Sequence, residues 1–103
     1  APRSGANDAG ARDAARAIDA AALIDALDRL DTSPCRARLA SEVSLRGWVG
    51  RDGVAFELEA EVVGGAPGAA ACVRDLVAAA RLPAPGDGMA LEFTKKIFLP
   101  KLR

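Results

Sequence analysis

With 103 residues, the chain is long enough for one domain and too short for two separate cores. Its residues are 50% hydrophobic but only 4% aromatic, and fourteen basic residues balance fourteen acidic ones, which argues against a general binder of nucleic acid or another polyanion. Histidine is absent, and with it the commonest proton-transfer group and transition-metal ligand, so most hydrolase triads and mononuclear zinc sites are excluded.

The first part of the chain is rich in small and polar residues. Residues 1–15 contain no large apolar side chain, so we expect a flexible linker there and a single domain over residues 16–103. From Ile18 to Leu30 the apolar residues follow helical spacing, with Leu23 and Leu27 on one side. No apolar run of about 18 residues occurs, so we expect membrane attachment only through a segment outside these residues.

A short helix and a strand are predicted next. Ser33 is expected to cap a short helix with Pro34 at its first position, and Cys35 and Leu39 are expected to share one face of it. Residues 42–49 change to a period of two, which predicts a strand. Its two faces carry Val43, Leu45 and Val49 on one side and Ser44, Arg46 and Trp48 on the other.

A hairpin and a second strand follow. Gly50-Arg51-Asp52-Gly53 is a hairpin signal, because Asp and Gly tolerate positive φ in a tight turn. Residues 54–63 alternate, which predicts a strand with opposite apolar and acidic faces. The expected faces are Val54, Phe56, Leu58, Ala60 and Val62 on one side and Glu57, Glu59 and Glu61 on the other.

The last third predicts an amphipathic helix and a third strand. The apolar stripe of the helix comprises Ala69, Cys72, Val73, Leu76 and Ala80. Pro83 and Pro85 end this helix, and period two returns in a strand over residues 89–99. The order predicts an α+β fold in two layers: a small antiparallel three-stranded sheet, built strand-strand-helix-strand, with the N-terminal helices packed on one face.

The chain has two cysteines, Cys35 and Cys72, on two predicted helices. A disulfide between them would stabilise an alanine-rich core, and two buried free thiols are the alternative. Neither a metal site nor a redox catalyst is expected, because histidine is absent and the spacing is unlike Cys-x-x-Cys.

The charged residues and the single tryptophan are candidates for functional roles. The three strand glutamates are interpreted as a solvated ladder facing Arg46, Arg51 or Lys96. Trp48, on a polar strand face, is interpreted either as covering a sheet edge or the first helix, or as an anchor for a partner. Lys95, Lys96, Lys101 and Arg103 make the end of the chain mildly basic, which usually indicates a solvated terminus.

The stretch from Cys35 to Leu99 resembles the TonB C-terminal-like domains of the AgmX/PglI type, which occur in cell-envelope proteins of myxobacteria and relatives. The resemblance lies in a helical cysteine, the Asp52-Gly53 turn, the helix opening 71–74 (Ala-Cys-Val-Arg) and the stretch 81–88. It implies a disulfide between the matching cysteines, a TonB-like fold and a non-enzymatic module of an energy transducer or envelope-spanning machine in the periplasm or cell envelope. The first strand, Trp48 and the lysine pair of the last strand depart from the family pattern.

We therefore expect a protein-interaction module that binds a partner segment, such as a peptide strand of an outer-envelope protein, along a sheet edge. The expected partner-binding residues are Trp48, Leu91, Phe93, Thr94, Lys95 and Lys96. The alternative is a cytosolic adaptor or regulatory domain with reduced cysteines. No catalytic residue is expected, because no nucleophile has a plausible base beside it. No cofactor, metal or nucleic-acid partner is expected either, since the chain lacks histidine and its charges balance. Whether the chain forms a homodimer is left open by the sequence.

Overall fold

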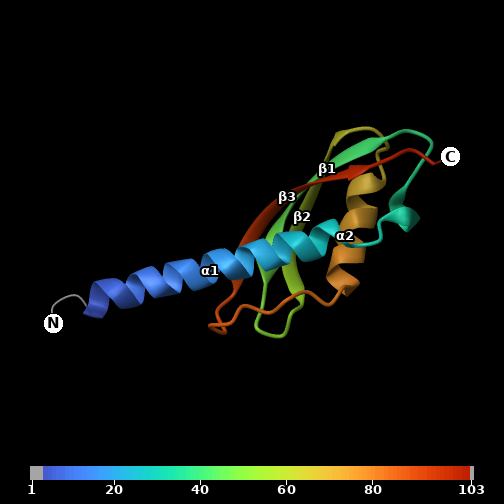
Figure 1. Cartoon of the computed structure of the whole chain (residues 1–103). Helices are drawn as coiled ribbons and strands as arrows, with labels where there is room; N and C mark the ends of the chain where they lie inside the picture. Colours follow the sequence, from blue (N-terminus) through green and yellow to red (C-terminus); the bar gives the residue numbers. More distant parts are fainter. Residues whose placement is uncertain (1–3, 103) are drawn as a thin grey trace.

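The computed structural model describes residues 4–102 and shows two helices on one side of a three-stranded antiparallel sheet (Figure 1). This confirms the expected α+β class. The elements in chain order are α1 (Ser4–Asp28), the 3-10 helix η1 (Ser33–Cys35), β1 (Ser41–Val49), β2 (Ala55–Gly64), α2 (Ala69–Ala79) and β3 (Leu91–Leu99). The strand order is β2-β1-β3, so the first strand in sequence lies at the centre of the sheet.

Helix α1 begins earlier than the sequence predicted. Residues 4–15 of the expected linker are helical, and residues 1–3 lie outside the described residues. Alanine has the highest helix propensity, so a segment without large apolar residues still forms local helix. Leu23 and Leu27 attach the second half of α1 to the core, whereas Ile18 is exposed. The domain boundary at residue 16 stays a prediction.

The turn after α1 differs from the predicted helix. Thr32 precedes η1, and Ser33 is its first residue, whose backbone N–H donates to Asp31 Oδ1 over 3.0 Å. The pKa of Asp31 is lowered, first by its hydrogen bonding with Ser33. The chain becomes extended at Arg36, so Leu39 is not on the buried face with Cys35 but is exposed. The expected cap and the expected face of Leu39 are therefore wrong.

A bulge changes the facing of β2. Arg46 pairs with Glu59 and Trp48 pairs with Phe56, so β2 has one residue more than β1 over this stretch. Glu57 there has a φ of 50°, the positive value that a bulge permits. The extra residue reverses the alternation, so Ala55 faces the helices and Phe56 is 42% exposed on the outer face. The prediction that Val54 and Phe56 share the face of the later apolar residues is wrong.

The opposite strand accommodates this bulge with a glycine. A Cβ on Gly47 would lie 2.6 Å from Leu58 Cδ2, which is closer than packed side chains come. A second irregularity lies at the far end of the pair, where Glu42 pairs with Gly64 and Val43 with Val62. By contrast, β1 and β3 pair continuously from Ser41↔Leu99 to Val49↔Leu91.

Helix α2 packs against β1 and β2, and α1 packs against β3. Ala69, Val73 and Val77 of α2 are buried, and Cys72 is partly buried. Most of the predicted stripe thus faces the core, and Val77 must be added to it. The largest fully buried side chains are Leu23, Val43, Leu45, Val49, Val73, Val77 and Leu99.

A disulfide joins Cys35 of η1 to Cys72 of α2, with 5.5 Å between the two Cα atoms. This is the pairing that the sequence favoured over two free thiols. The bridge attaches the segment between α1 and β1 to the helix that covers β1 and β2.

The turn before β3 holds the middle of α1. The Arg16 guanidinium forms an ion pair with Asp87, and the Gly86 N–H donates to Asp19 Oδ2 over 3.0 Å. The pKa of Asp87 is lowered, chiefly because the Met89 N–H donates to its carboxylate and then because of Arg16. Strand β3 starts at Leu91 rather than Met89, which lies exposed in this turn.

Candidate functional site

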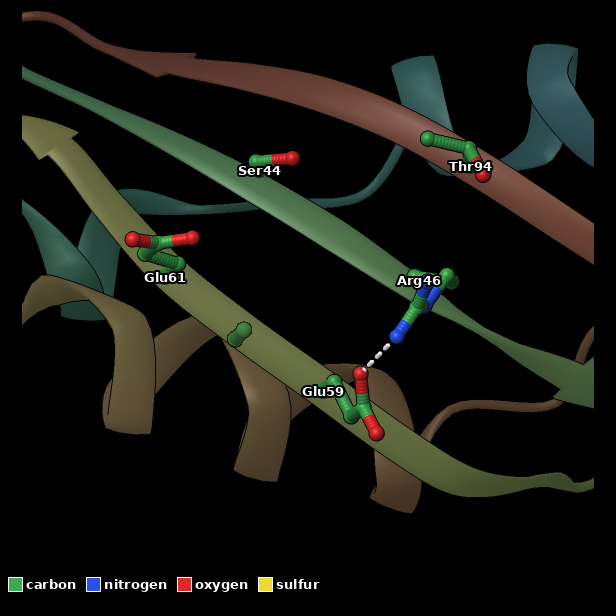
Figure 2. A pocket seen from close by; sticks show the side chains of 6 residues that line it. Ser44, Arg46, Glu59, Glu61 and Thr94 are labelled. Carbon is green, nitrogen blue, oxygen red and sulfur yellow. Dashed lines mark hydrogen bonds and ion pairs between the residues drawn. The ribbon is translucent and has the colours of Figure 1, made fainter.

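Part of the outer face of the sheet bears polar side chains, and both helices lie on the other side (Figure 1). Residues of all three strands line a shallow depression of about 360 Å³ on this face. Figure 2 shows Ser44 and Arg46 on the central strand between Glu59 and Glu61 on β2 and Thr94 on β3. These hydroxyl, guanidinium and carboxylate groups can bind polar groups of a partner.

Two residues that line this depression form an ion pair. The Arg46 guanidinium donates to the Glu59 carboxylate, and the two residues are cross-strand partners. The hydrogen bond and the attraction of Glu59 raise the pKa of Arg46. Of the three glutamates, Glu59 therefore meets Arg46, one of the three cations that the sequence offered, whereas Arg51 and Lys96 form no ion pair with a described side chain.

The described residues offer little for chemistry at this face. Among them, no group of three His, Cys, Asp or Glu side chains is arranged to hold a metal ion. Ser44 and Thr94 are the hydroxyls in the depression, and the chain has no histidine to act as their base.

The two edges of the sheet differ in regularity. Strand β3 keeps one register with β1 over all nine of its residues. Strand β2 has two irregularities, and one of them includes the positive φ of Glu57. A bulge bends and twists an edge and so hinders the addition of another strand. Of the two edges, β3 is therefore the better template for a further strand.

The residues predicted to bind a partner lie on different sides of the sheet. Leu91 and Phe93 point toward the helices and are buried. Thr94 and Lys96 are exposed on the outer face. Their side chains can meet a strand added to β3, whereas Leu91 and Phe93 would meet it through their backbone.

Lys95 and Trp48 complete the predicted set. Lys95 is partly buried on the helix side of β3, and its Nζ lies 2.6 Å from Asp28 Oδ1 at the end of α1. Trp48 is half-buried on the central strand, between its cross-strand partners Phe56 and Glu92. It is therefore removed from the free edge of β3 by one strand.

A hollow of about 320 Å³ lies between the end of α1 and β3. It is lined by Leu27, Asp28, Leu30, Thr32, Lys95, Lys96, Ile97 and Phe98. The sequence analysis missed this contact between helix and edge. The Asp28–Lys95 ion pair had no sequence signal, since the two residues are far apart in the chain.

The sequence analysis also missed the pairing of Phe56 with Trp48 on the outer face. The signal available was Gly47 in a strand, since glycine inside a strand often marks a bulge or a close approach of another residue. A bulge opposite Gly47 would have reversed the predicted facing of Phe56.

Comparisons with known proteins give this chain no relative: no family model, no curated protein and no solved structure matches it. The resemblance to TonB C-terminal-like domains thus rests on the residues alone. None of the described helices combines the length and the apolar character needed to cross a membrane.

Proposed function

We propose that this chain is a non-enzymatic interaction module that binds an extended segment of a protein partner along the free edge of β3. The observation that carries the proposal is the uninterrupted nine-residue register of β3, compared with the two irregularities of β2. An added strand binds through backbone hydrogen bonds, so this function needs no catalytic residue or cofactor.

The ion pair beneath the edge supports the same proposal. An inward-pointing charge is one of the devices that keep a sheet edge from pairing. In this protein the inward charge of Lys95 is balanced by Asp28, which reduces the penalty of covering it. The exposed Lys96 and Thr94 then remain available to select the side chains of the partner.

An oxidising compartment, the periplasm or cell envelope, is the proposed location. The Cys35–Cys72 disulfide supports it, because such bonds persist outside the reducing cytosol. The resemblance to TonB C-terminal-like domains supports a place in an energy transducer or an envelope-spanning machine. The alternative, a cytosolic adaptor, requires both thiols to be free. Mass measurement after alkylation without reductant separates the two, because two alkylated cysteines in natively isolated protein would exclude the envelope location.

Proline substitution tests the edge. Neighbouring residues of an antiparallel strand alternate between N–H groups that bond the adjacent strand and N–H groups that point to the free edge. Leu91 and Thr94 are separated by an odd number of residue steps, so the backbone N–H of one bonds β1 and that of the other points to the free edge. One of the variants Leu91→Pro and Thr94→Pro therefore removes only an outward N–H and leaves the hydrogen bonds to β1 intact. Circular dichroism identifies that variant by its native spectrum. Glu61→Pro and Val62→Pro are the matched pair on the β2 edge.

The readout is cross-linking of the partner in cell-envelope extract. A photo-reactive benzoylphenylalanine replaces Lys96 beside the edge, and in the control it replaces Arg74 on the exposed side of α2. We expect a cross-link at the Lys96 position that the natively folded β3 proline variant abolishes and the natively folded β2 variant retains. A cross-link that survives the β3 proline would refute docking on this edge.

A further inference from the structure

One end of the molecule collects exposed cations and exposed large apolar side chains. We call it the basic tip, and it consists of Arg36, Arg38, Leu39, Phe98, Lys101 and Leu102. The Leu102 N–H donates to the Ala37 carbonyl over 2.8 Å, which holds the segment after β3 against the segment before β1. Figure 1 shows the C-terminal end beside this connection, opposite the first residues of α1.

The apolar members of the basic tip are strongly exposed. Leu39 is 64% exposed, Phe98 is 66% exposed and Leu102 is 53% exposed. Single exposed apolar residues are ordinary on protein surfaces, but a group of them at one place indicates a contact surface. Val63, near the end of β2, is also exposed and lies next to the Glu42↔Gly64 pair, close to the basic tip.

The charges at the basic tip are mainly positive. Arg36, Arg38 and Lys101 are exposed, and none of them lies within ion-pair distance of an acidic side chain among the described residues. The nearby acidic groups are Asp31, which is exposed and attracted to Arg36, and Glu42, which is partly buried, so three cations stand against two carboxylates. The tip therefore complements an anionic surface.

We propose that the basic tip docks on the surface of an anionic lipid bilayer. Basic residues are attracted to anionic headgroups, while apolar side chains enter the boundary between headgroups and acyl chains. A bilayer fits better than an acidic polypeptide, because Leu39 and Leu102 lie in irregular segments at the end of the molecule opposite the first residues of α1. A flat surface can contact such a tip as a whole.

This proposal goes beyond strand binding at β3 and does not depend on it. The sequence predicted membrane attachment only through a segment outside these residues, because it contains no apolar run of about 18 residues. Leu39 and Leu102 gave no such signal, since they are 63 residues apart in the chain. Folding brings their segments together through the backbone hydrogen bond at Ala37.

Vesicle co-sedimentation of the oxidised chain tests the proposal. The probes are vesicles of phosphatidylcholine with and without phosphatidylglycerol. We expect binding only to the anionic vesicles, weakened by salt. Each basic residue near an anionic membrane contributes about fivefold to binding. The triple variant Arg36→Glu, Arg38→Glu and Lys101→Glu should therefore lose about a hundredfold or more. Leu39→Ser with Leu102→Ser should lose about tenfold through the apolar contact.

Matched controls carry the same changes elsewhere on the surface. Arg51→Glu, Arg74→Glu and Arg81→Glu change the net charge by the same amount, and Ile18→Ser with Met89→Ser removes equally exposed apolar side chains. Circular dichroism verifies folding, which these exposed positions should not alter. The proposal is overturned if the unmodified chain ignores anionic vesicles or if the controls lose as much binding as the tip variants. Binding of a polyglutamate peptide without vesicle binding would assign the tip to an acidic protein segment and also overturn it.

Discussion

Removal of the disulfide should cost this protein a large part of its stability. The bridge spans a sequence separation of 37 residues. In the chain-entropy description, closing a loop of that length stabilises the fold by about 4 kcal/mol, mainly by restricting the unfolded chain. A small domain has about 5–15 kcal/mol in total. The variant Cys35→Ala/Cys72→Ala should therefore melt roughly 15–30 °C below the oxidised chain, since each kcal/mol corresponds to about 4–8 °C at this size.

Urea and thermal unfolding, followed by circular dichroism, measure this loss. The reduced unmodified chain is the control, because it keeps both sulfur atoms and lacks only the bond. We expect the reduced chain and the alanine variant to have similar melting temperatures, both well below that of the oxidised chain. If the oxidised and reduced chains differ by less than about 1 kcal/mol, the entropic reasoning is refuted for this protein.

The remaining predictions concern α1, a backbone turn and one carboxylate. Leu23→Ala, which empties a buried site, should lower the free energy of unfolding by about 2–5 kcal/mol, whereas Ile18→Ala on the exposed side should change it by less than about 0.5 kcal/mol in the same urea titration. Gly65→Ala should destabilise by at least about 1–3 kcal/mol, because φ is +110° and the new Cβ would press against a backbone carbonyl, while Gly64→Ala meets open space and should be tolerated. Asp87 has a pKa lowered from its ordinary 3.8, so its contribution is present above that value and disappears as the pH falls through the folded-state pKa. The gap in melting temperature between the unmodified chain and Asp87→Asn should therefore close in acid, and a gap that persists there would contradict the linkage.

Local patterns predicted the parts of this fold that depend on neighbouring residues. The Asp52-Gly53 turn lies where the sequence placed it, and Gly53 has the expected positive φ of 75°. The stripe of α2 was found because Ala69 and Val73 are buried on one side of a regular helix. The disulfide followed from two cysteines on apolar faces in an alanine-rich chain.

The errors arose where a single residue changes the geometry of everything before or after it. The alternation of apolar and polar residues in the sequence does not show where a strand has an extra residue. The bulge at Glu57 therefore places Phe56 on the outer face although the sequence pattern continues unchanged. The candidate edge shows a related limit. The last strand was predicted as the docking edge, and it does lie at an edge of the sheet, but no local pattern showed that the end of α1 would lie beside it.

The attachment of α1 has a consequence for the proposed function. Strand β3 is covered on its inner side by α1, whose buried apolar contacts are Leu23 and Leu27. The other contacts that hold α1 are polar. They are the ion pairs of Arg16 with Asp87 and of Asp28 with Lys95, and the hydrogen bond from the Gly86 N–H to Asp19. The docking edge thus depends on one of the less firmly packed elements of the fold. Under the proposed function, a partner that requires the α1–β3 contact must also strengthen it, because coupling between two equilibria is reciprocal. Binding at β3 should then slow hydrogen exchange in the second half of α1, although no residue of that half lies in the strand ladder.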